Sequence, residues 1–289
     1  FKQQFGITPG QCREGEEPQG TVPTEDTELE NPVEARERTV LVVEDDADLR
    51  RYLCNEFKAR NYAVLEAENG QEGLELAMNA LPDMIVTDVM MPVMDGLELC
   101  EKIKKCDSTN HIPLVVLTAR TDSSLEIEGL NTGADEYLSK PFDMDVLAAR
   151  INNLLENRKK LAARCRQQLS DPADETDPIV VEDPFLQRVM ACIEDHLQDS
   201  SFSVEQLAEK MGVTSRTLQR KIPVLADVAP KALIKTVRLK KAYQLLKTTD
   251  LPVAAVAYEC GFEHANYFSA QFKQHFGSSP SQIRKNAAS

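Results

Sequence analysis

Five short apolar runs, separated by helical patterns, constrain the fold of this chain more than any other feature of its sequence. Apolar residues occupy neighbouring positions within these runs, which is typical of strands that are buried on both faces of a sheet. The alternation of such strands with helices predicts an α/β domain with a doubly wound, five-stranded parallel sheet. The runs are TVLVV (39–43), YAVLEA (62–67), DMIVT (83–87), PLVVLT (113–118) and EYLS (136–139).

Charged and hydroxyl-bearing residues stand where these predicted strands end. Because the carboxyl ends of parallel strands form the ligand crevice of an open sheet, one cleft should hold several carboxylates, a hydroxyl group and an ammonium group. The residues are Glu44, Asp45 and Asp46 after the first strand, Asp88 after the third, Thr118 at the end of the fourth and Lys140 after the fifth.

This set of side chains suits phosphoryl chemistry on a carboxylate. Clustered carboxylates repel one another unless a cation neutralises them, and oxygen ligands of this kind suit Mg²⁺. A carboxylate beside Mg²⁺ and a lysine can attack phosphorus and form an aspartyl phosphate. Alternatively, Glu44, Asp45 and Asp46 only cap a helix that begins near Ala47. Capping alone explains poorly why acids and a lysine stand at four different strand ends.

The C-terminal part of the chain is helical and contains an internal repeat. LAEKMGV (207–213) and VAYECGF (256–262) match at an offset of 49, and each places an alanine four residues before a glycine. Gly212 and Gly261 stand where a helix should stop and a tight turn begin, and a further helix follows each turn. The repeat therefore predicts an all-α domain with two helix-turn-helix units, opened by a capping box of Ser203 and Gln206.

Charge and composition separate the two halves. The net charge is −14, yet from residue 200 onward Lys and Arg outnumber Asp and Glu by 13 to 6. An acidic half and a basic half predict different partners, with a polyanion for the C-terminal half. Seven cysteines without a C-x-x-C pair suit a reducing cytosol, and no apolar run approaches the ~18 residues of a membrane span, so we expect a cytoplasmic protein without membrane contact.

Residues from about 39 to 158 resemble the receiver domain of bacterial two-component response regulators, which has a flavodoxin-like fold. The resemblance implies that Asp88 accepts a phosphoryl group, assisted by Thr118 and Lys140, and that Tyr137 is an aromatic switch. It also implies a Mg²⁺ site made by Glu44, Asp45, Asp88 and the Met90 carbonyl, and a cis bond between Lys140 and Pro141. The matching stretches are LVVEDDADLRRYL, DVMMPVMDGLELC, LTAR and YLSKPF.

Residues 182–286 resemble the AraC/XylS-type DNA-binding domain. The resemblance implies recognition helices at about 214–222 and 264–275 that enter successive major-groove segments. The matching stretches are SVEQLAEKMGVTSRTLQRKI, VRLKKAYQLLKTTDLPVAAVAYECGFEHANYFSAQFKQHF and GSSPSQIRK.

In the first recognition helix, Leu218 and Ile222 should face the core, which turns Arg216, Gln219 and Arg220 outward. Arginine can pair with guanine and glutamine with adenine, so these three are candidate base readers. A merely solvated basic face is the alternative. In the second helix the candidates for base contact are His264, Asn266 and Ser269. Elsewhere in the domain and in this helix, the candidates for phosphate contact are Lys240, Lys241 and Lys273.

The first recognition helix departs from the family pattern at its end. Pro223 cannot donate a backbone hydrogen bond, so it either weakens the last turn or ends the helix early. Asp227 stands where a glycine would easily adopt positive φ, a conformation that aspartate tolerates better than most residues. DNA binding by the first unit is weakened if the helix is distorted.

We therefore expect a transcription regulator that a sensor histidine kinase phosphorylates on Asp88 and that binds double-stranded DNA, as a homodimer when phosphorylated. We expect no separate enzyme in the chain. The expected parts are a tail remnant and acidic linker (1–38), the receiver (39–160), a helix extension and linker (161–181) and the DNA-binding domain (182–289). The alternatives are the output end of a hybrid sensor kinase and an interaction module with impaired DNA binding.

The first fourteen residues repeat the end of the chain. FKQQFGITPGQCRE (1–14) and FKQHFGSSPSQIRK (272–285) are identical at eight positions. The simplest hypothesis is that the chain is a fragment of a longer protein with a second AraC-type domain upstream. A duplicated tail peptide is the alternative.

Overall fold

The computed structural model describes residues 38–119, 133–170 and 183–287. The tail-like opening stretch, the acidic linker up to residue 37 and the second linker after Ser170 lie outside these residues.

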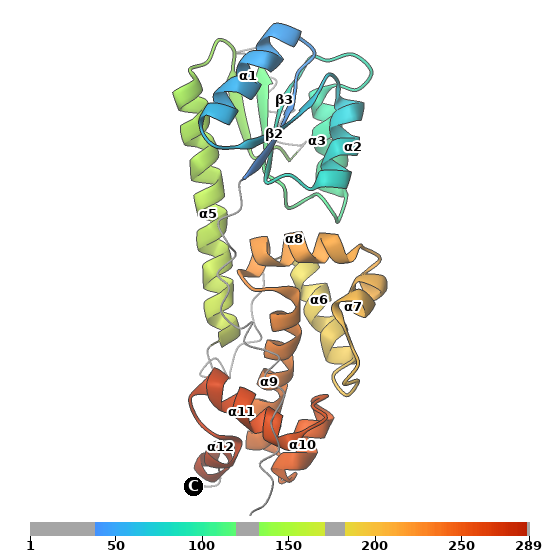
Figure 1. Ribbon diagram of the computed structural model, residues 1–289, viewed down its shortest axis with the longest axis vertical. Helices are drawn as coiled ribbons and strands as arrows, with labels where there is room; N and C mark the ends of the chain where they lie inside the picture. Colours follow the sequence, from blue (N-terminus) through green and yellow to red (C-terminus); the bar gives the residue numbers. More distant parts are fainter. Residues whose placement is uncertain (1–37, 120–132, 171–182, 288–289) are drawn as a thin grey trace, which may run out of the picture. The chain divides into compact units, whose positions relative to one another are not determined.

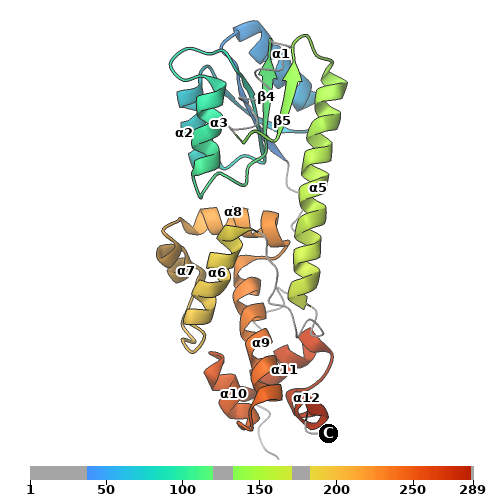
Figure 2. The same ribbon diagram turned by 180° about the vertical axis from the view of Figure 1, so that it is seen from behind.

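The N-terminal half contains a five-stranded parallel sheet with the strand order β2-β1-β3-β4-β5, which confirms the predicted doubly wound fold (Figures 1 and 2). The alternation of buried strands with amphipathic helices thus has the predicted consequence. The elements are β1 (Thr39–Val43), α1 (Ala47–Ala59), β2 (Ala63–Ala67), α2 (Gly70–Ala80), β3 (Met84–Asp88), α3 (Gly96–Lys105), β4 (Leu114–Thr118), β5 (Glu136–Ser139) and α5 (Met144–Ser170).

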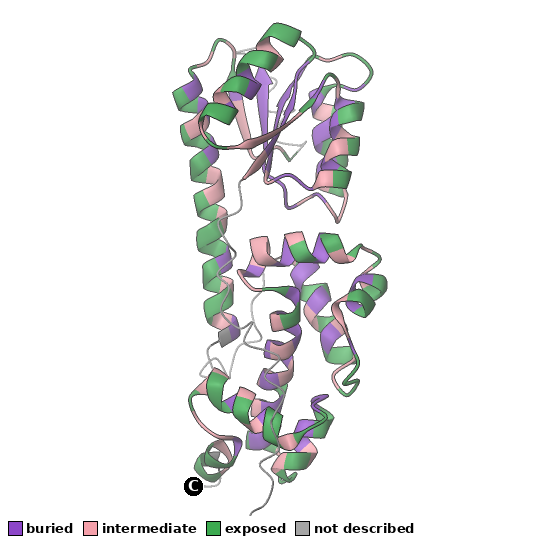
Figure 3. Ribbon diagram, viewed as in Figure 1, coloured by how far each residue is buried: buried purple, intermediate pink, exposed green. Residues whose placement is uncertain are grey.

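Each central strand supplies two hydrophobic cores, one on each face of the sheet. In β1, Val40 and Val42 pack with α1 and α5, whereas Leu41 and Val43 pack with α2 and α3. This alternation follows from the two-residue period of a strand, and Figure 3 shows the central strands buried between the helices. Because β3 and β4 are buried along their whole length, the ends of these strands are firmly positioned.

The pairing register brings the strand ends to one edge of the sheet. Val43 of β1 is opposite Thr87 of β3, and Asp88 is opposite Leu117 of β4. Thr118, the last residue of β4, is opposite Ser139 of β5. The residues that follow β1, β3 and β5 therefore leave the sheet at the same edge.

An ionic cluster around Asp135 joins α3, β4 and α5. Asp135 accepts hydrogen bonds from Lys104 Nζ at 2.6 Å, Arg158 Nη2 at 2.7 Å and the Leu114 N–H at 2.8 Å. Burial acts to raise the pKa of Asp135, but Arg158 and Lys104 offset this effect and hold the pKa below its usual value. The carboxylate is therefore charged in the folded protein at lower pH than in the unfolded chain.

We expect Asp135→Asn to lower the free energy of unfolding by about 2 kcal/mol at pH 7, because two partly buried cations lose their anion. A depressed pKa stabilises the fold above the unfolded-state pKa of about 3.9, and this contribution is lost as the pH falls through the folded-state value. The difference in free energy of unfolding between wild type and variant should therefore shrink below about pH 4. Urea unfolding, monitored by circular dichroism, measures this difference.

Glu101→Gln is the matched control, because Glu101 pairs with Lys105 on the exposed surface of α3. Its loss should change the free energy of unfolding far less than Asp135→Asn does, because solvent screens an exposed ion pair. If Asp135→Asn and wild type are equally stable at pH 7, the ionic cluster does not contribute to the free energy of unfolding.

The C-terminal half is built from seven helices within residues 183–287, and it contains both predicted helix-turn-helix units (Figure 1). The units are α7 with α8 and α10 with α11. The elements are α6 (Pro184–Asp195), α7 (Val204–Met211), α8 (Ser215–Ala226), α9 (Pro230–Thr248), α10 (Val253–Glu259), α11 (Ala265–Phe276) and α12 (Pro280–Ala287).

The local signals at the helix ends behave as predicted, with one exception. Ser203 and Gln206 form the capping box, and Gly212 and Gly261 have φ values of 66° and 73°. Of the two alternatives at Pro223, an early end of α8 is wrong, because the helix continues through Pro223 to Ala226. Asp227 ends it in the left-handed conformation, with φ 51° and its N–H bonded to the Pro223 carbonyl at 3.0 Å.

Pro223 is tolerated in α8 because a proline removes one backbone donor without removing the side chains that hold the helix. Leu218, Ile222 and Ala226 are fully buried in the core of the first unit, on both sides of Pro223 in the sequence. In a short helix, such tertiary packing outweighs the loss of one hydrogen bond.

Candidate functional site

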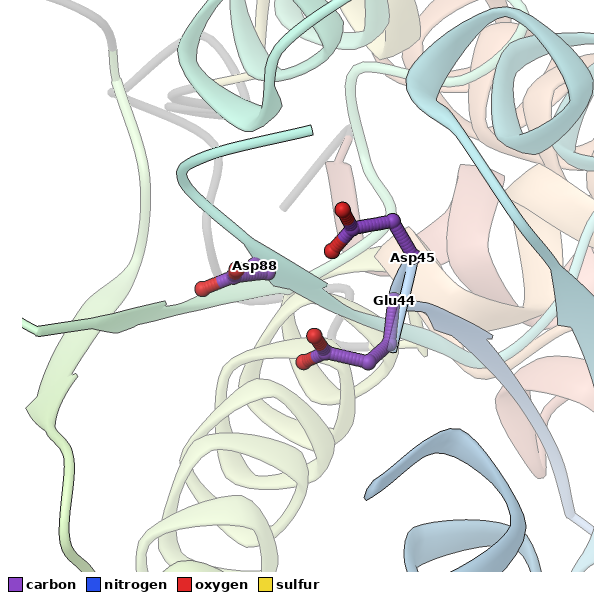
Figure 4. A group of neighbouring side chains, drawn as sticks. All are labelled: Glu44, Asp45 and Asp88. Carbon is purple, nitrogen blue, oxygen red and sulfur yellow. The ribbon is translucent and has the colours of Figure 1, made fainter. Parts of the chain in front are cut away.

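Three carboxylates gather where β1 and β3 end. Oxygen atoms of Glu44, Asp45 and Asp88 all lie within 4.8 Å of one another (Figure 4). Asp46 is different, because its Oδ1 accepts hydrogen bonds from the N–H groups of Asp48 at 2.9 Å and Leu49 at 3.0 Å. The capping explanation therefore applies to Asp46, while Glu44 and Asp45 belong to the cluster.

Lys140 joins two of these carboxylates. Its Nζ lies 2.9 Å from Glu44 Oε2 and 2.9 Å from Asp88 Oδ1. Burial acts to lower the pKa of Lys140, but the hydrogen bonds to Asp88 and Glu44 offset this and raise it. Burial of the Glu44 side chain, which is only 2% exposed, raises the pKa of that carboxyl group. The cluster therefore has one firmly charged cation and a glutamate that is costly to ionise.

The donor set fits a small, hard cation. Three carboxylates in contact repel one another, and a single ammonium group leaves an excess of negative charge. Carboxylate oxygens, together with water, are the ligands that Mg²⁺ prefers. A divalent cation bound by these three side chains would offset the energetic cost of ionising Glu44.

The other residues predicted for this site belong to β4, β5 and the loop after β3. Thr118 is buried at the end of β4, and Tyr137 of β5 is half-buried against the core on the α2 and α3 side. Met90, the predicted backbone ligand, has a side chain that is 75% exposed in the loop after β3. The bond between Lys140 and Pro141 is cis, as the resemblance implied.

In α8, Leu218 and Ile222 are fully buried as predicted. Arg216 and Gln219 are exposed and Arg220 is half-buried, so the first two present their side chains to solvent. Arg216 and Gln219 are therefore the more accessible of the three candidate base readers, and Arg220 is only partly accessible.

In α11, the aromatic face is buried at Phe268 and Phe272, and the predicted polar positions lie elsewhere. His264, just before the helix, and Asn266 are exposed. Ser269 is half-buried, and its hydroxyl group donates a hydrogen bond to the Ala265 carbonyl at 2.9 Å.

The lysines predicted to contact phosphates differ in exposure. Lys241 and Lys273 are exposed, while Lys240 is half-buried. Lys241 and Lys273 are therefore the better placed of the three for a polyanion.

Family models match two separate stretches of the chain. Residues 40–152 match the response regulator receiver domain, and residues 207–286 match a helix-turn-helix domain of the AraC type. The chain carries a receiver domain followed by an AraC-type helix-turn-helix domain. Among the described residues, the receiver and the helix-turn-helix domain contain no helix with the length and apolar character that a membrane span requires.

Curated relatives match one or both domains. A protein named histidine kinase P4 from Formosa agariphila is 38% identical over 91% of this chain, which spans 19% of that relative. The response regulator ArlR of Staphylococcus aureus is 40% identical over 41% of this chain and 53% of its own length. A solved structure of a response regulator described as putative, from Chloroflexus aurantiacus, is 35% identical over 41% of this chain and 97% of its own, with a TM-score of 0.39.

Sequence reasoning missed two residues that position the receiver cluster. Arg50 donates hydrogen bonds from Nη1 to the Glu44 carbonyl at 2.7 Å and the Asp45 carbonyl at 3.3 Å, and so it holds the acidic loop. Gly96 packs directly on the Asp88 backbone, and its N–H donates to the Val89 carbonyl at 2.9 Å. The dipeptide Asp95-Gly96, which is typical of turns, was the available signal for Gly96, whereas no pattern marks Arg50.

Proposed function

We propose that this chain is a phosphorylation-controlled, sequence-specific DNA-binding regulator of a two-component system. The observation that carries the proposal is the contact of Lys140 with both Glu44 and Asp88 in a chain that also contains two helix-turn-helix units. A receiver domain implies a sensor histidine kinase as partner, and a helix-turn-helix domain implies double-stranded DNA. Both partners place the protein in the cytoplasm.

The proposed reaction is transfer of a phosphoryl group to Asp88. A carboxylate oxygen of Asp88 attacks the phosphorus of a phosphohistidine on the kinase, a P–O bond forms, the P–N bond breaks, and the imidazole leaves with the electron pair. Lys140 stabilises the negative charge on the transferred oxygens, and the Thr118 hydroxyl donates a hydrogen bond to them. Mg²⁺, held by Glu44, Asp45, Asp88 and the Met90 carbonyl, would neutralise charge on the phosphoryl group.

The proposed output is a change of the receiver surface followed by DNA binding. Thr118 and Tyr137 reorient after phosphorylation, and this change alters homodimer formation or frees the C-terminal domain. We propose that this surface includes the segment between β4 and β5, of which residues 120–132 lie outside the described residues. The exposed side chains of Arg216, Gln219 and Asn266 support base contact by α8 and α11.

A second candidate is the output part of a longer hybrid histidine kinase. The similarity to histidine kinase P4 supports it, because that match covers both domains of this chain. The proposed chemistry at Asp88 is the same, but the phosphoryl group would come from a kinase domain of the same polypeptide. Reading the gene upstream of this segment distinguishes the two candidates.

The test combines phosphorylation with DNA selection. The full chain is incubated with and without acetyl phosphate and Mg²⁺, bound duplexes are selected from a random pool, and the recovered sequences are footprinted. We expect phosphorylation to increase affinity for one recovered sequence and Asp88→Ala to abolish the increase. Equal footprints for wild type and Asp88→Ala under all conditions would contradict the proposal and favour an interaction module.

A further inference from the structure

The two helix-turn-helix units share one helix, and a single arginine stands where their cores meet. The first part of α9 packs into the core of α6, α7 and α8, which includes Val237. The second part packs into the core of α10 and α11, which begins with Leu239. Arg238 lies between these two residues, half-buried, so it marks the boundary between the units.

The guanidinium group of Arg238 contacts both units through backbone carbonyls. Its Nη2 donates to the carbonyl of Asp199, in the loop between α6 and α7, at 2.5 Å. Its Nη1 donates to the carbonyl of Gly261, in the turn between α10 and α11, at 3.4 Å. A planar guanidinium has donors in a fixed arrangement, so one side chain ties the two loops at a set distance and angle.

Two further hydrogen bonds flank Arg238 and join the same loops. Gln198 Nε2 donates to Glu259 at 2.5 Å, and Ser200 Oγ donates to Glu263 at 3.1 Å. The backbones also approach closely, because a Cβ added to Gly261 would lie 2.3 Å from the Leu197 carbonyl oxygen. Residues 197–200 and 259–263, together with Arg238, form what we call the inter-unit clasp.

We propose that the inter-unit clasp, with Arg238 at its centre, fixes the relative orientation of the two helix-turn-helix units and so selects DNA sites by the spacing of their two half-sites. Arg238 is thus a positioning residue: it sets the DNA specificity of the two units without contacting DNA itself. This inference rests on the proposed DNA-binding function.

The geometry of DNA makes spacing a sensitive quantity. Neighbouring major-groove segments are about 10.5 base pairs apart, so one added base pair turns the second half-site by about 34° and moves it by about 3.4 Å. Two rigidly joined recognition helices cannot follow this change, and one of them loses its base contacts. Two loosely joined helices can follow it, and discrimination between spacings is lost.

The test measures affinity against spacing for the full chain treated with acetyl phosphate. The duplex is the sequence that wild type selects, with one base pair removed from or added between its half-sites. We call the affinity for the optimal duplex divided by the affinity for an altered duplex the spacing ratio, and we expect it to be at least tenfold for wild type. In Arg238→Met the spacing ratio should fall to about threefold or less, while Arg238→Lys should show an intermediate value.

Two further variants distinguish the proposed positioning role of Arg238 from the effects of losing a positive charge or destabilising the domain. Lys247→Met removes the same charge from an exposed position of the same helix outside the clasp, and its spacing ratio should equal that of wild type. Gln198→Ala combined with Ser200→Ala removes both flanking hydrogen bonds at the surface, so it weakens the clasp without opening a core, and it should lower the ratio. Thermal unfolding by circular dichroism checks that each variant is folded.

A distance measurement without DNA tests the inter-unit clasp independently of the proposed DNA-binding function. Spin labels at exposed positions 209 in α7 and 274 in α11, introduced as non-natural residues because the chain has seven cysteines, report the separation of the units. A broader distance distribution in Arg238→Met than in wild type and Lys247→Met supports the clasp. An unchanged distribution or an unchanged spacing ratio overturns it. A broadened distribution with no DNA binding by any version overturns the proposed function instead.

Discussion

Replacing Lys140 by methionine is expected to slow phosphorylation of Asp88 by at least about a hundredfold, because the ammonium group that contacts Asp88 is lost from a partly buried site. The side chain of Lys140 is 21% exposed and lies 2.9 Å from both Asp88 and Glu44. Methionine keeps most of the apolar stem and removes the charge. Incorporation of radiolabelled phosphate from acetyl phosphate, followed over time at saturating Mg²⁺, measures the rate.

The same variant should respond to pH with a definite sign. Burial already raises the pKa of Glu44, and loss of Lys140 removes the partner that lowers it. A carboxyl group whose pKa is raised on folding stabilises the fold at low pH and loses that contribution as the pH rises through the folded-state value. The stability of Lys140→Met relative to wild type should therefore fall as the pH rises above the ordinary glutamate pKa of about 4.3, and Mg²⁺ should restore part of it.

Lys104→Met is the matched control, because Lys104 is also partly buried and paired with a carboxylate in the same domain. Its loss should lower stability, yet the phosphorylation rate of the folded protein should stay within about twofold of wild type. If both lysine variants slow phosphorylation equally, the effect is one of folding, and Lys140 has no special role in the transfer.

The receiver half was largely predictable because its evidence is local and repeated. Five apolar runs with polar ends specify the sheet, and the topology of a parallel sheet then places Glu44, Asp88 and Lys140 together. The family resemblance implied the division of labour among the three acids after β1, but the pattern of residues by itself did not. It depends on which side chain turns back toward the first N–H groups of α1, and the structure shows that Asp46 does so.

The C-terminal half was predictable in its helices and turns but not in the links between them. Gly212 and Gly261 mark turns because they can adopt positive φ, and this property is visible in one residue. The contacts of Arg238 are with backbone carbonyls that lie 39 and 23 residues away in the chain. Every residue has a backbone carbonyl, so the residue types at these two positions do not indicate that their carbonyls bind Arg238.

Gly96 packs directly on the backbone of Asp88, the proposed phosphoacceptor. A Cβ at position 96 would lie 1.9 Å from the Asp88 carbonyl oxygen and 2.9 Å from the Asp88 carbonyl carbon. Real Cβ contacts of this length do not occur, and the opposing atoms are backbone, which cannot rotate away. The helix α3 or the end of β3 must therefore move if residue 96 acquires a side chain.

We expect Gly96→Ala to lower the free energy of unfolding of the receiver by about 3 kcal/mol, near the upper range for added volume in a packed site. The phosphorylation rate of the folded fraction should fall by at least about tenfold, since a displacement of about 1 Å at a reacting group can cost a hundredfold. Urea unfolding and radiolabelled phosphate incorporation measure the two effects on one preparation.

Gly212→Ala provides the contrast, because a Cβ there meets no atom within 4 Å and the residue lies in the other domain. Its cost arises only from the left-handed backbone, with φ 66°, and should be about 1 kcal/mol. Phosphorylation of Asp88 should be unaffected by it. If Gly96→Ala has the stability and phosphorylation rate of wild type, α3 can shift without moving Asp88. The position of the Asp88 carboxylate would then not depend on the packing of Gly96 against its backbone.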